Sequence, residues 1–255
     1  MFRGFELKLD ENTFSQQVGD FTLYENEGEY LKTDLHAFFG RNIQKFTYDS
    51  SFSIDGNEIE NRWFPKSSGL FHVFLSHSHA DEQLALAITG LLKRFGICVF
   101  VDSLVWGFRD QLIRQLFAFG EKTYPNLVSM CSHVDCMLMK SLIEMMDSCE
   151  CLLFLNTPQS ISAREAVRQT HSPWIYAELE ASRFLRSHPD PARTPLQVVV
   201  ENFSSRKKQA SDRANIAYNL PEHLTKLSIV QFRQWMKRAC RKKGFDALNE
   251  LYKYS

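Results

Sequence analysis

The sequence lacks several features that would place it in common protein classes. No stretch approaches the roughly 20 apolar residues of a membrane span, and residues 1–14 hold no apolar segment of signal-peptide length. The 30 Lys and Arg residues balance 30 Asp and Glu residues, so no excess charge suggests nucleic acid or an anionic membrane. Six cysteines without a framework spacing fit a reducing compartment. We therefore expect a cytoplasmic protein with neither a membrane nor nucleic acid as partner.

Familiar nucleotide-binding and hydrolase fingerprints are also missing. The apolar stretch at residues 71–75 is not followed by G-x-G-x-x-G, and the chain contains neither G-x-x-x-x-G-K-[ST] nor G-x-S-x-G. The expected strand at residues 151–155 leads into Asn156 rather than Asp, which argues against a receiver domain with Mg²⁺ ligands there. These absences exclude the dinucleotide fingerprint, the P-loop and the nucleophile elbow.

Cysteine and histidine residues offer metal ligands, but at unfavourable spacings. No C-x-x-C pair exists, as structural zinc sites usually require. Cys136 lies in an apolar helical pattern and Cys151 opens an apolar strand. We predict no metal site and interpret these cysteines as buried thiols. The residues considered as metal ligands are Cys131, His133, Cys136, Cys149 and Cys151, with His77 and His79 as a second group.

The apolar content is 44% and includes 21 Phe residues, so a sizeable core is expected. From residue 70 onward, short apolar stretches alternate with helical patterns. This alternation predicts an α/β fold, with a five-stranded parallel sheet and helices on both faces. Strands are expected at residues 71–75, 97–101, 151–155, 196–200 and 227–232. Helices are expected at residues 80–95, 110–119, 132–148, 172–185 and 235–252.

Residues 1–69 are less regular, and we interpret them as an N-terminal extension to a domain formed by residues 70–255. Asp55-Gly56-Asn57 between two short apolar stretches predicts a β-hairpin, and residues 31–39 predict a short helix. The extension is expected to pack against the edge of the domain. Within the domain, residues 103–131 form a long excursion after the second strand, and such segments are often functional.

Glu178 is the most unusual residue of the predicted helices. On a helical wheel it falls within the apolar arc of residues 172–185, one turn after Trp174. Burying a carboxylate there is unfavourable unless it has a partner. Glu178 either pairs with an arginine or a backbone group, or it serves as a working carboxylate at the edge of a ligand site.

Polar residues follow three of the predicted strands. Ligands of open parallel sheets bind outside the carboxyl ends of the strands, so these residues and Glu178 can face one crevice. The residues are Ser76 and His77 after the first strand, Asp102 and Ser103 after the second, and Asn156 and Thr157 after the third.

Four segments resemble Toll/interleukin-1 receptor (TIR) domains. Residues 73–81 resemble the first strand and loop of that family, and residues 97–102 resemble its second strand, which precedes the BB loop. Residues 151–157 resemble its third strand. Residues 172–179, SPWIYAEL, resemble its S-x-W-x-x-x-E-L motif. The resemblance covers residues 70–255 and is closest to bacterial antiphage (Thoeris-like) TIR proteins. It implies a flavodoxin-like TIR fold.

The resemblance also implies an activity. Catalytic TIR domains depend on the Glu of this motif to cleave NAD⁺, and that residue corresponds to Glu178. The implied products are nicotinamide and ADP-ribose or a cyclic ADP-ribose-type messenger. NAD⁺ is thus the substrate and no cofactor is needed. Candidate substrate-binding residues are Ser76, His77, Asp102, Ser103, Trp106 and Trp174.

Self-association through TIR–TIR contacts and a downstream effector that senses the product are the implied partners. The alternative is a non-enzymatic TIR scaffold, and a more distant one is a transferase that processes nucleosides.

Overall fold

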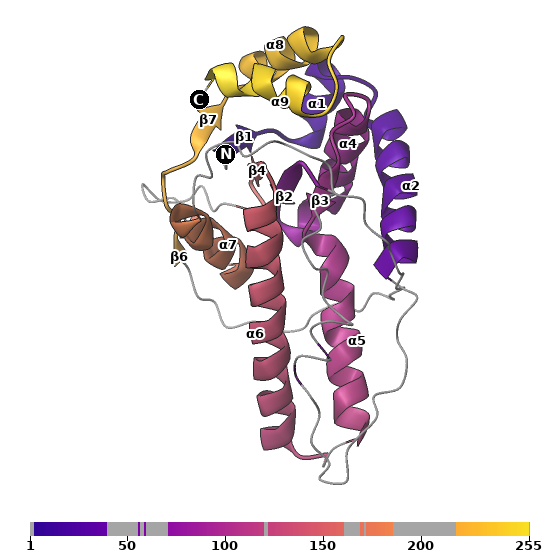
Figure 1. Ribbon diagram of the computed structural model, residues 1–255, viewed down its shortest axis with the longest axis vertical. Coiled ribbons are helices and arrows are strands. Elements are labelled where there is room, and N and C mark those ends of the chain that lie inside the picture. Colours follow the sequence, from indigo (N-terminus) through magenta and orange to yellow (C-terminus); the bar gives the residue numbers. More distant parts are fainter. Residues whose placement is uncertain are drawn as a thin grey trace.

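A five-stranded sheet organises the computed structural model (Figure 1). The structure describes residues 3–39, Gly56, Ile59, 71–119, 122–160, 169–170, 172–185 and 218–254. All pairings in the sheet are parallel and the strand order is β3-β2-β4-β1-β7. The strands are β1 Arg3–Lys8, β2 Val73–Ser76, β3 Val99–Val101, β4 Cys151–Asn156 and β7 Thr225–Leu227. The predicted α/β class, with a flavodoxin-like parallel sheet, is confirmed.

The strand β1 is a finding that the sequence analysis did not anticipate. It lies between β4 and β7 and pairs with both, so it occupies the fourth place in the sheet. Phe5 and Leu7 are fully buried on one face of it. The first residues of the supposed extension therefore contribute an interior strand rather than packing beside the sheet. The strand expected at residues 196–200 lies outside the described residues.

Side chains alternate between the two faces of the sheet and build two separate cores. The first core cluster lies under α1 Glu11–Gln17, α4 Glu82–Lys93, α8 Ile229–Ala239 and α9 Phe245–Leu251. It contains Phe5, Leu75, Leu153 and Trp235. Trp235 also donates a hydrogen bond from Nε1 to the Ala247 carbonyl at 2.7 Å, which joins α8 to α9.

The second core cluster lies on the opposite face, under α5 Ser103–Phe119, α6 Tyr124–Ser148 and α7 Pro173–Phe184. It includes Phe74, Phe154, Leu142 and Ile175. The excursion predicted at residues 103–131 is largely helical. In Figure 1, α5 and the 25-residue α6 run side by side well beyond the sheet. Thr123 caps α6 by accepting a hydrogen bond from the Asn126 backbone N–H, so the helix starts earlier than predicted.

The helix α2, Phe21–Phe39, packs tightly along α4. Two glycines make this close approach possible. A Cβ atom at Gly28 would lie 2.1 Å from the Leu86 carbonyl oxygen, and one at Gly90 would lie 2.1 Å from the Tyr24 carbonyl oxygen. The N-terminal helix is thus held against the domain through backbone contact that larger residues would prevent.

Gly28→Ala should therefore destabilise the protein. Alanine normally favours a helix over glycine by about 1 kcal/mol, but overpacking at Gly28 should reverse the sign, with a net loss of about 1–3 kcal/mol. Urea unfolding of the variant would measure it. Gly56→Ala is the matched control, because Gly56 is helical and a Cβ there meets nothing within 4 Å. Equal effects of the two substitutions would contradict the close packing.

Several predicted element bounds need correction. The strand predicted at residues 227–232 ends at Leu227, because Ser228 and Gln231 form a capping box that starts α8. The closing helix predicted at residues 235–252 is interrupted before α9, where Gly244 has a φ of 54°. The hairpin predicted around residue 56 is wrong where it can be tested, since Gly56 and Ile59 are helical.

The remaining elements are short. The 3-10 helix η1, His79–Asp81, precedes α4, and η2, Tyr252–Tyr254, follows α9. The strands β5 Gln169–Thr170 and β6 Tyr218–Asn219 pair in an antiparallel sheet of their own.

Candidate functional site

Glu178 reaches the carboxyl edge of the sheet from α7. The Ser172 side chain accepts a hydrogen bond from the Ile175 backbone N–H and Pro173 lies in the first turn, so the predicted start of this helix is confirmed. Ile175 and Leu179 anchor one face of α7 in the second core cluster. Glu178 lies on that buried face and is 0% exposed.

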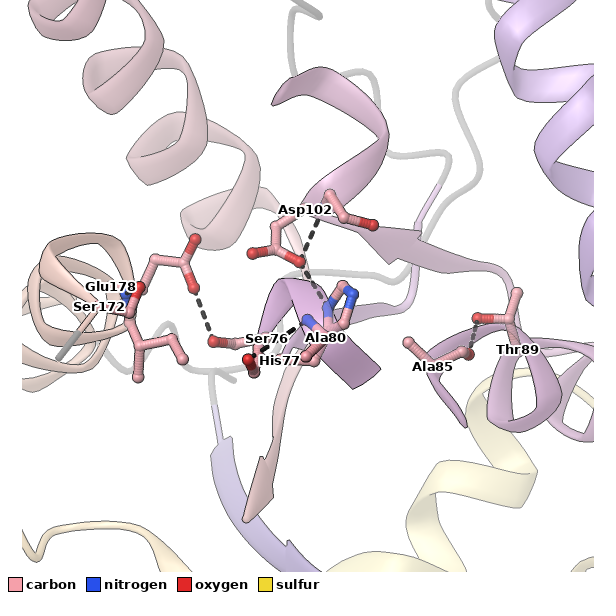
Figure 2. A network of polar contacts seen from close by, with 11 residues as sticks. Ser76, His77, Ala80, Ala85, Thr89, Asp102, Ser172 and Glu178 are labelled. Carbon is pink, nitrogen blue, oxygen red and sulfur yellow. Dashed lines mark hydrogen bonds and ion pairs between the residues drawn. The ribbon is translucent and has the colours of Figure 1, made fainter. Parts of the chain in front are cut away.

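The partner of Glu178 is a hydroxyl group. Ser76, at the end of β2, donates a hydrogen bond from Oγ to Glu178 Oε2 at 2.6 Å (Figure 2). The sequence left open that Glu178 pairs with an arginine or a backbone group. Within the described part of the chain, neither kind of group hydrogen-bonds to it. The hydrogen bond that favours the ionised carboxyl group therefore comes from Ser76.

A second acidic group lies next to it. Asp102, at the end of β3, forms an ion pair with His77, whose Nδ1 lies 2.7 Å from Asp102 Oδ1. The Ser103 backbone N–H donates to the same Asp102 oxygen at 2.8 Å. Figure 2 shows Asp102 between Glu178 and His77, with Ser76 below. Four residues that the sequence placed at one crevice are therefore brought together by three elements.

Burial raises the pKa of Glu178 well above the ordinary value of 4.5, and the charge of Asp102 raises it further. The hydrogen bond from Ser76 acts in the opposite direction but is outweighed. For His77, burial lowers the pKa, but Asp102 together with Glu82 and Asp81 outweighs burial, and the pKa lies above 6.5. Compared with the same groups in water, the site therefore favours the protonated form of Glu178 and the charged form of His77.

These shifts predict a pH-dependent stability. Because the folded protein holds the Glu178 proton more tightly than the unfolded chain does, stability should fall as pH rises from about 4.5 toward the raised pKa. Glu178→Gln removes this titration. The free energy of unfolding of the variant, measured in urea, should therefore rise relative to that of the wild type as the pH increases. Glu180→Gln, on the same helix, is the control. A wild type and a Glu178→Gln variant with the same pH dependence would contradict the raised pKa.

Three of the predicted site residues bury a polar atom that has no hydrogen-bond partner among the described residues. The atoms are Glu178 Oε1, His77 Nε2 and Ser103 Oγ. Buried polar atoms are nearly always paired, and leaving one unpaired costs about 1–3 kcal/mol. Such a cost is often retained where the groups serve a ligand. The edge of the sheet therefore offers a polar molecule the imidazole nitrogen of His77, the hydroxyl group of Ser103 and a carboxyl oxygen of Glu178.

Two tryptophans, Trp174 and Trp106, were predicted to bind the substrate. Trp174 is half-buried and packs against the second core cluster, one turn before Glu178. Trp106 lies in α5, just after Asp102 and Ser103, but its side chain is outside the described part. Trp174 is therefore placed near the site, and the binding role of Trp106 stays a prediction.

Two carboxylates near this edge were not predicted as site residues. Glu6 on β1 accepts a hydrogen bond from Asn156 Nδ2 at 2.5 Å. Asp81 accepts one from Thr157 Oγ1 at 2.6 Å, and burial raises the pKa of Asp81. The alternation of Phe5, Leu7 and Leu9 with polar residues was the one signal in the sequence that could have placed Glu6 on a strand.

The cysteines are free thiols. Cys149 and Cys151 are buried as expected, and burial raises the pKa of both thiols. The expectation is wrong for Cys136, which is exposed, because it lies on the outer side of α6. Within the described ranges, no three His, Cys, Asp or Glu side chains are grouped so that they could hold a metal ion.

Comparison of the chain with protein-family models, curated proteins and solved structures gives no match. Within the parts of the chain that the structure describes, no helix is both long and apolar enough to cross a membrane.

Proposed function

We propose that the protein is a TIR-type NAD⁺ nucleosidase in which Glu178 is the catalytic residue. The observation that carries the proposal is the fully buried Glu178 at the carboxyl edge of a parallel sheet, with Oε1 unpaired. The S-x-W-x-x-x-E-L resemblance at Ser172–Leu179 supports the same assignment. Carboxyl edges are where open parallel sheets bind nucleotides.

The chemistry needs only one carboxylate. Nicotinamide is a neutral leaving group that departs with the electron pair of the broken C1′–N bond, so no second acid has to protonate it. The ribose passes through a positively charged, oxocarbenium-like state, as in glycoside hydrolysis. An ionised Glu178 stabilises that charge and orients the ribose hydroxyls. Water or a nucleophile within the substrate then captures C1′, giving ADP-ribose or a cyclic isomer.

The remaining site residues have binding roles in this proposal. Ser76 orients the Glu178 carboxyl group, and Ser103 Oγ and His77 Nε2 offer hydrogen bonds to ribose or phosphate. Because Glu178 is 0% exposed, NAD⁺ must open this edge before it binds. Trp174 lies on the same helix as Glu178 and shapes the side on which nicotinamide leaves.

The cellular role follows from the same resemblance. We propose that the product signals to an effector in bacterial antiphage defence, in the cytoplasm, and that assembly through TIR–TIR contacts opens the site.

The test is incubation of the purified protein with NAD⁺ over a range of protein concentrations, followed by chromatography of the products. Nicotinamide release supports the proposal. Release from nicotinamide riboside at an equal rate would point instead to the nucleoside transferase. Concentration-dependent self-association without any release of nicotinamide would favour the scaffold.

A further inference from the structure

We propose that Asp102 and His77 form a positioning pair that sets whether Glu178 carries a proton, with Asp102 favouring the protonated carboxyl and His77 opposing Asp102. This inference rests on the proposed function for its catalytic consequence, but the proton equilibrium itself does not. It differs from the substrate-binding role expected for both residues. It assigns them an action through Glu178.

The geometry supports an action of His77 on Asp102 and of Asp102 on Glu178. Asp102 is 4% exposed, His77 2% and Glu178 0%, so their charges interact with little screening by solvent. His77 is in direct contact with Asp102 at 2.7 Å. Asp102 raises the pKa of Glu178 through its charge and through a side-chain hydrogen bond to the protonated carboxyl group. His77 therefore influences Glu178 by neutralising the carboxylate that lies between them.

Other charged groups also lie around Glu178, Asp102 and His77. Asp81 from η1 and Glu82 from α4 act on His77 in the same direction as Asp102. The Ser76 hydroxyl from β2 favours an ionised Glu178. Several charged side chains on the neighbouring helices pair with each other: Arg109 with Asp110 and Asp135, Lys140 with Glu144, and Arg183 with Glu180. Asp102 is the charged side chain that acts on the pKa of Glu178.

The arrangement has a consequence for the reaction. With Glu178 protonated, the buried cluster of Glu178, Asp102 and His77 has no net charge, which a dry site favours. The positively charged nicotinamide ring of bound NAD⁺, and then the ribose cation, bring a local charge that an ionised Glu178 can neutralise, and the Glu178 proton passes to water. The pair would keep the carboxylate discharged until the cation is bound.

The test follows the Glu178 carboxyl carbon by NMR in protein labelled with ¹³C-glutamate, titrated without NAD⁺. Glu178→Gln identifies the signal. Asp102→Asn should move the midpoint of Glu178 to lower pH by about one unit or more. His77→Gln should move it to higher pH, because Asp102 is then unneutralised. Ser76→Ala should also move it upward, through loss of a hydrogen bond to the ionised form.

Asp102→Asn and His77→Gln should move the Glu178 midpoint in opposite directions, which a merely structural role of the two residues would not produce. Asp110→Asn, which removes an exposed carboxylate paired with Arg109, is the matched control and should leave the midpoint in place. If His77→Gln does not fold, Ser76→Ala still tests the expected shift of the Glu178 midpoint to higher pH. If Asp102→Asn does not fold, Asp102→Ser tests the expected shift to lower pH. Shifts of equal sign, or shifts no larger than that of the control, would overturn the proposal.

This measurement separates the two proposals. Opposite shifts in a protein that never releases nicotinamide would sustain the positioning pair and refute the nucleosidase. In an active protein, the acidic limb of the pH profile of nicotinamide release should move in the same directions as the NMR midpoints. If the enzyme is active but Asp102→Asn does not move the acidic limb of its pH profile, the nucleosidase proposal stands and the positioning role of Asp102 and His77 is wrong.

Discussion

Phe5→Ala should lower the free energy of unfolding by about 3–5 kcal/mol, the usual cost of emptying a fully buried phenylalanine site. Phe5 is 0% exposed on the interior strand β1, which is flanked by β4 and β7. Its ring stacks on that of Tyr252 with centroids 6.2 Å apart, so the substitution would also loosen the C-terminal segment. Urea unfolding followed by circular dichroism would measure the change.

The control for Phe5 is Leu23→Ala on α2, where the leucine is 44% exposed. That substitution should change stability by no more than about 0.5 kcal/mol, as is usual at exposed positions. If Phe5→Ala proved as mild as Leu23→Ala, residues 3–8 would not be a strand of the sheet. An N-terminal extension beside the domain would then be the better interpretation.

Glu178→Gln should reduce the rate of nicotinamide release by about 10²–10³-fold, the typical loss when one group that stabilises transition-state charge is removed. Glutamine has the same shape and can still accept the hydrogen bond from Ser76, but it cannot carry the negative charge. The loss should appear in kcat more than in KM, because the charge on ribose develops during bond cleavage. Glu180→Gln should retain the wild-type rate, since Glu180 pairs with Arg183 instead.

The strands at the centre of the sheet and the helix α7 were predictable because their signals are local. β2, β3 and β4 are short apolar stretches, and the residues of the three strands are buried except for Asn156 at the end of β4, which is half-buried. The start of α7 follows from Ser172 and Pro173, whose capping preferences act within one turn. Alternation of strands and helices then leaves few topologies other than a parallel sheet.

The place of β1 depends on pairings far apart in sequence, which no local pattern reveals. Its partners begin at Cys151 and Thr225, and its apolar alternation covers only a few residues. The end of β7 was misjudged for a different reason. Apolar residues continue past Leu227, but the Ser228 capping box overrides their strand preference and starts α8.

The candidate site was predictable to the extent that strand ends define it. Ser76, His77 and Asp102 were placed at one edge with Glu178, and the structure brings them together. The partner of Glu178 and the His77–Asp102 ion pair could not be derived, because both depend on side-chain distances across strands. Glu6 was missed because its strand was missed.

The most direct test of the central claim is the yield of nicotinamide from NAD⁺, measured by chromatography for the wild type, Glu178→Gln and Glu180→Gln. Protein concentration should be varied over a wide range, because Glu178 is buried and we propose that assembly opens the site. We predict release by the wild type and Glu180→Gln, and almost none by Glu178→Gln. Full activity of Glu178→Gln, or no release by the wild type at any concentration, would contradict the account.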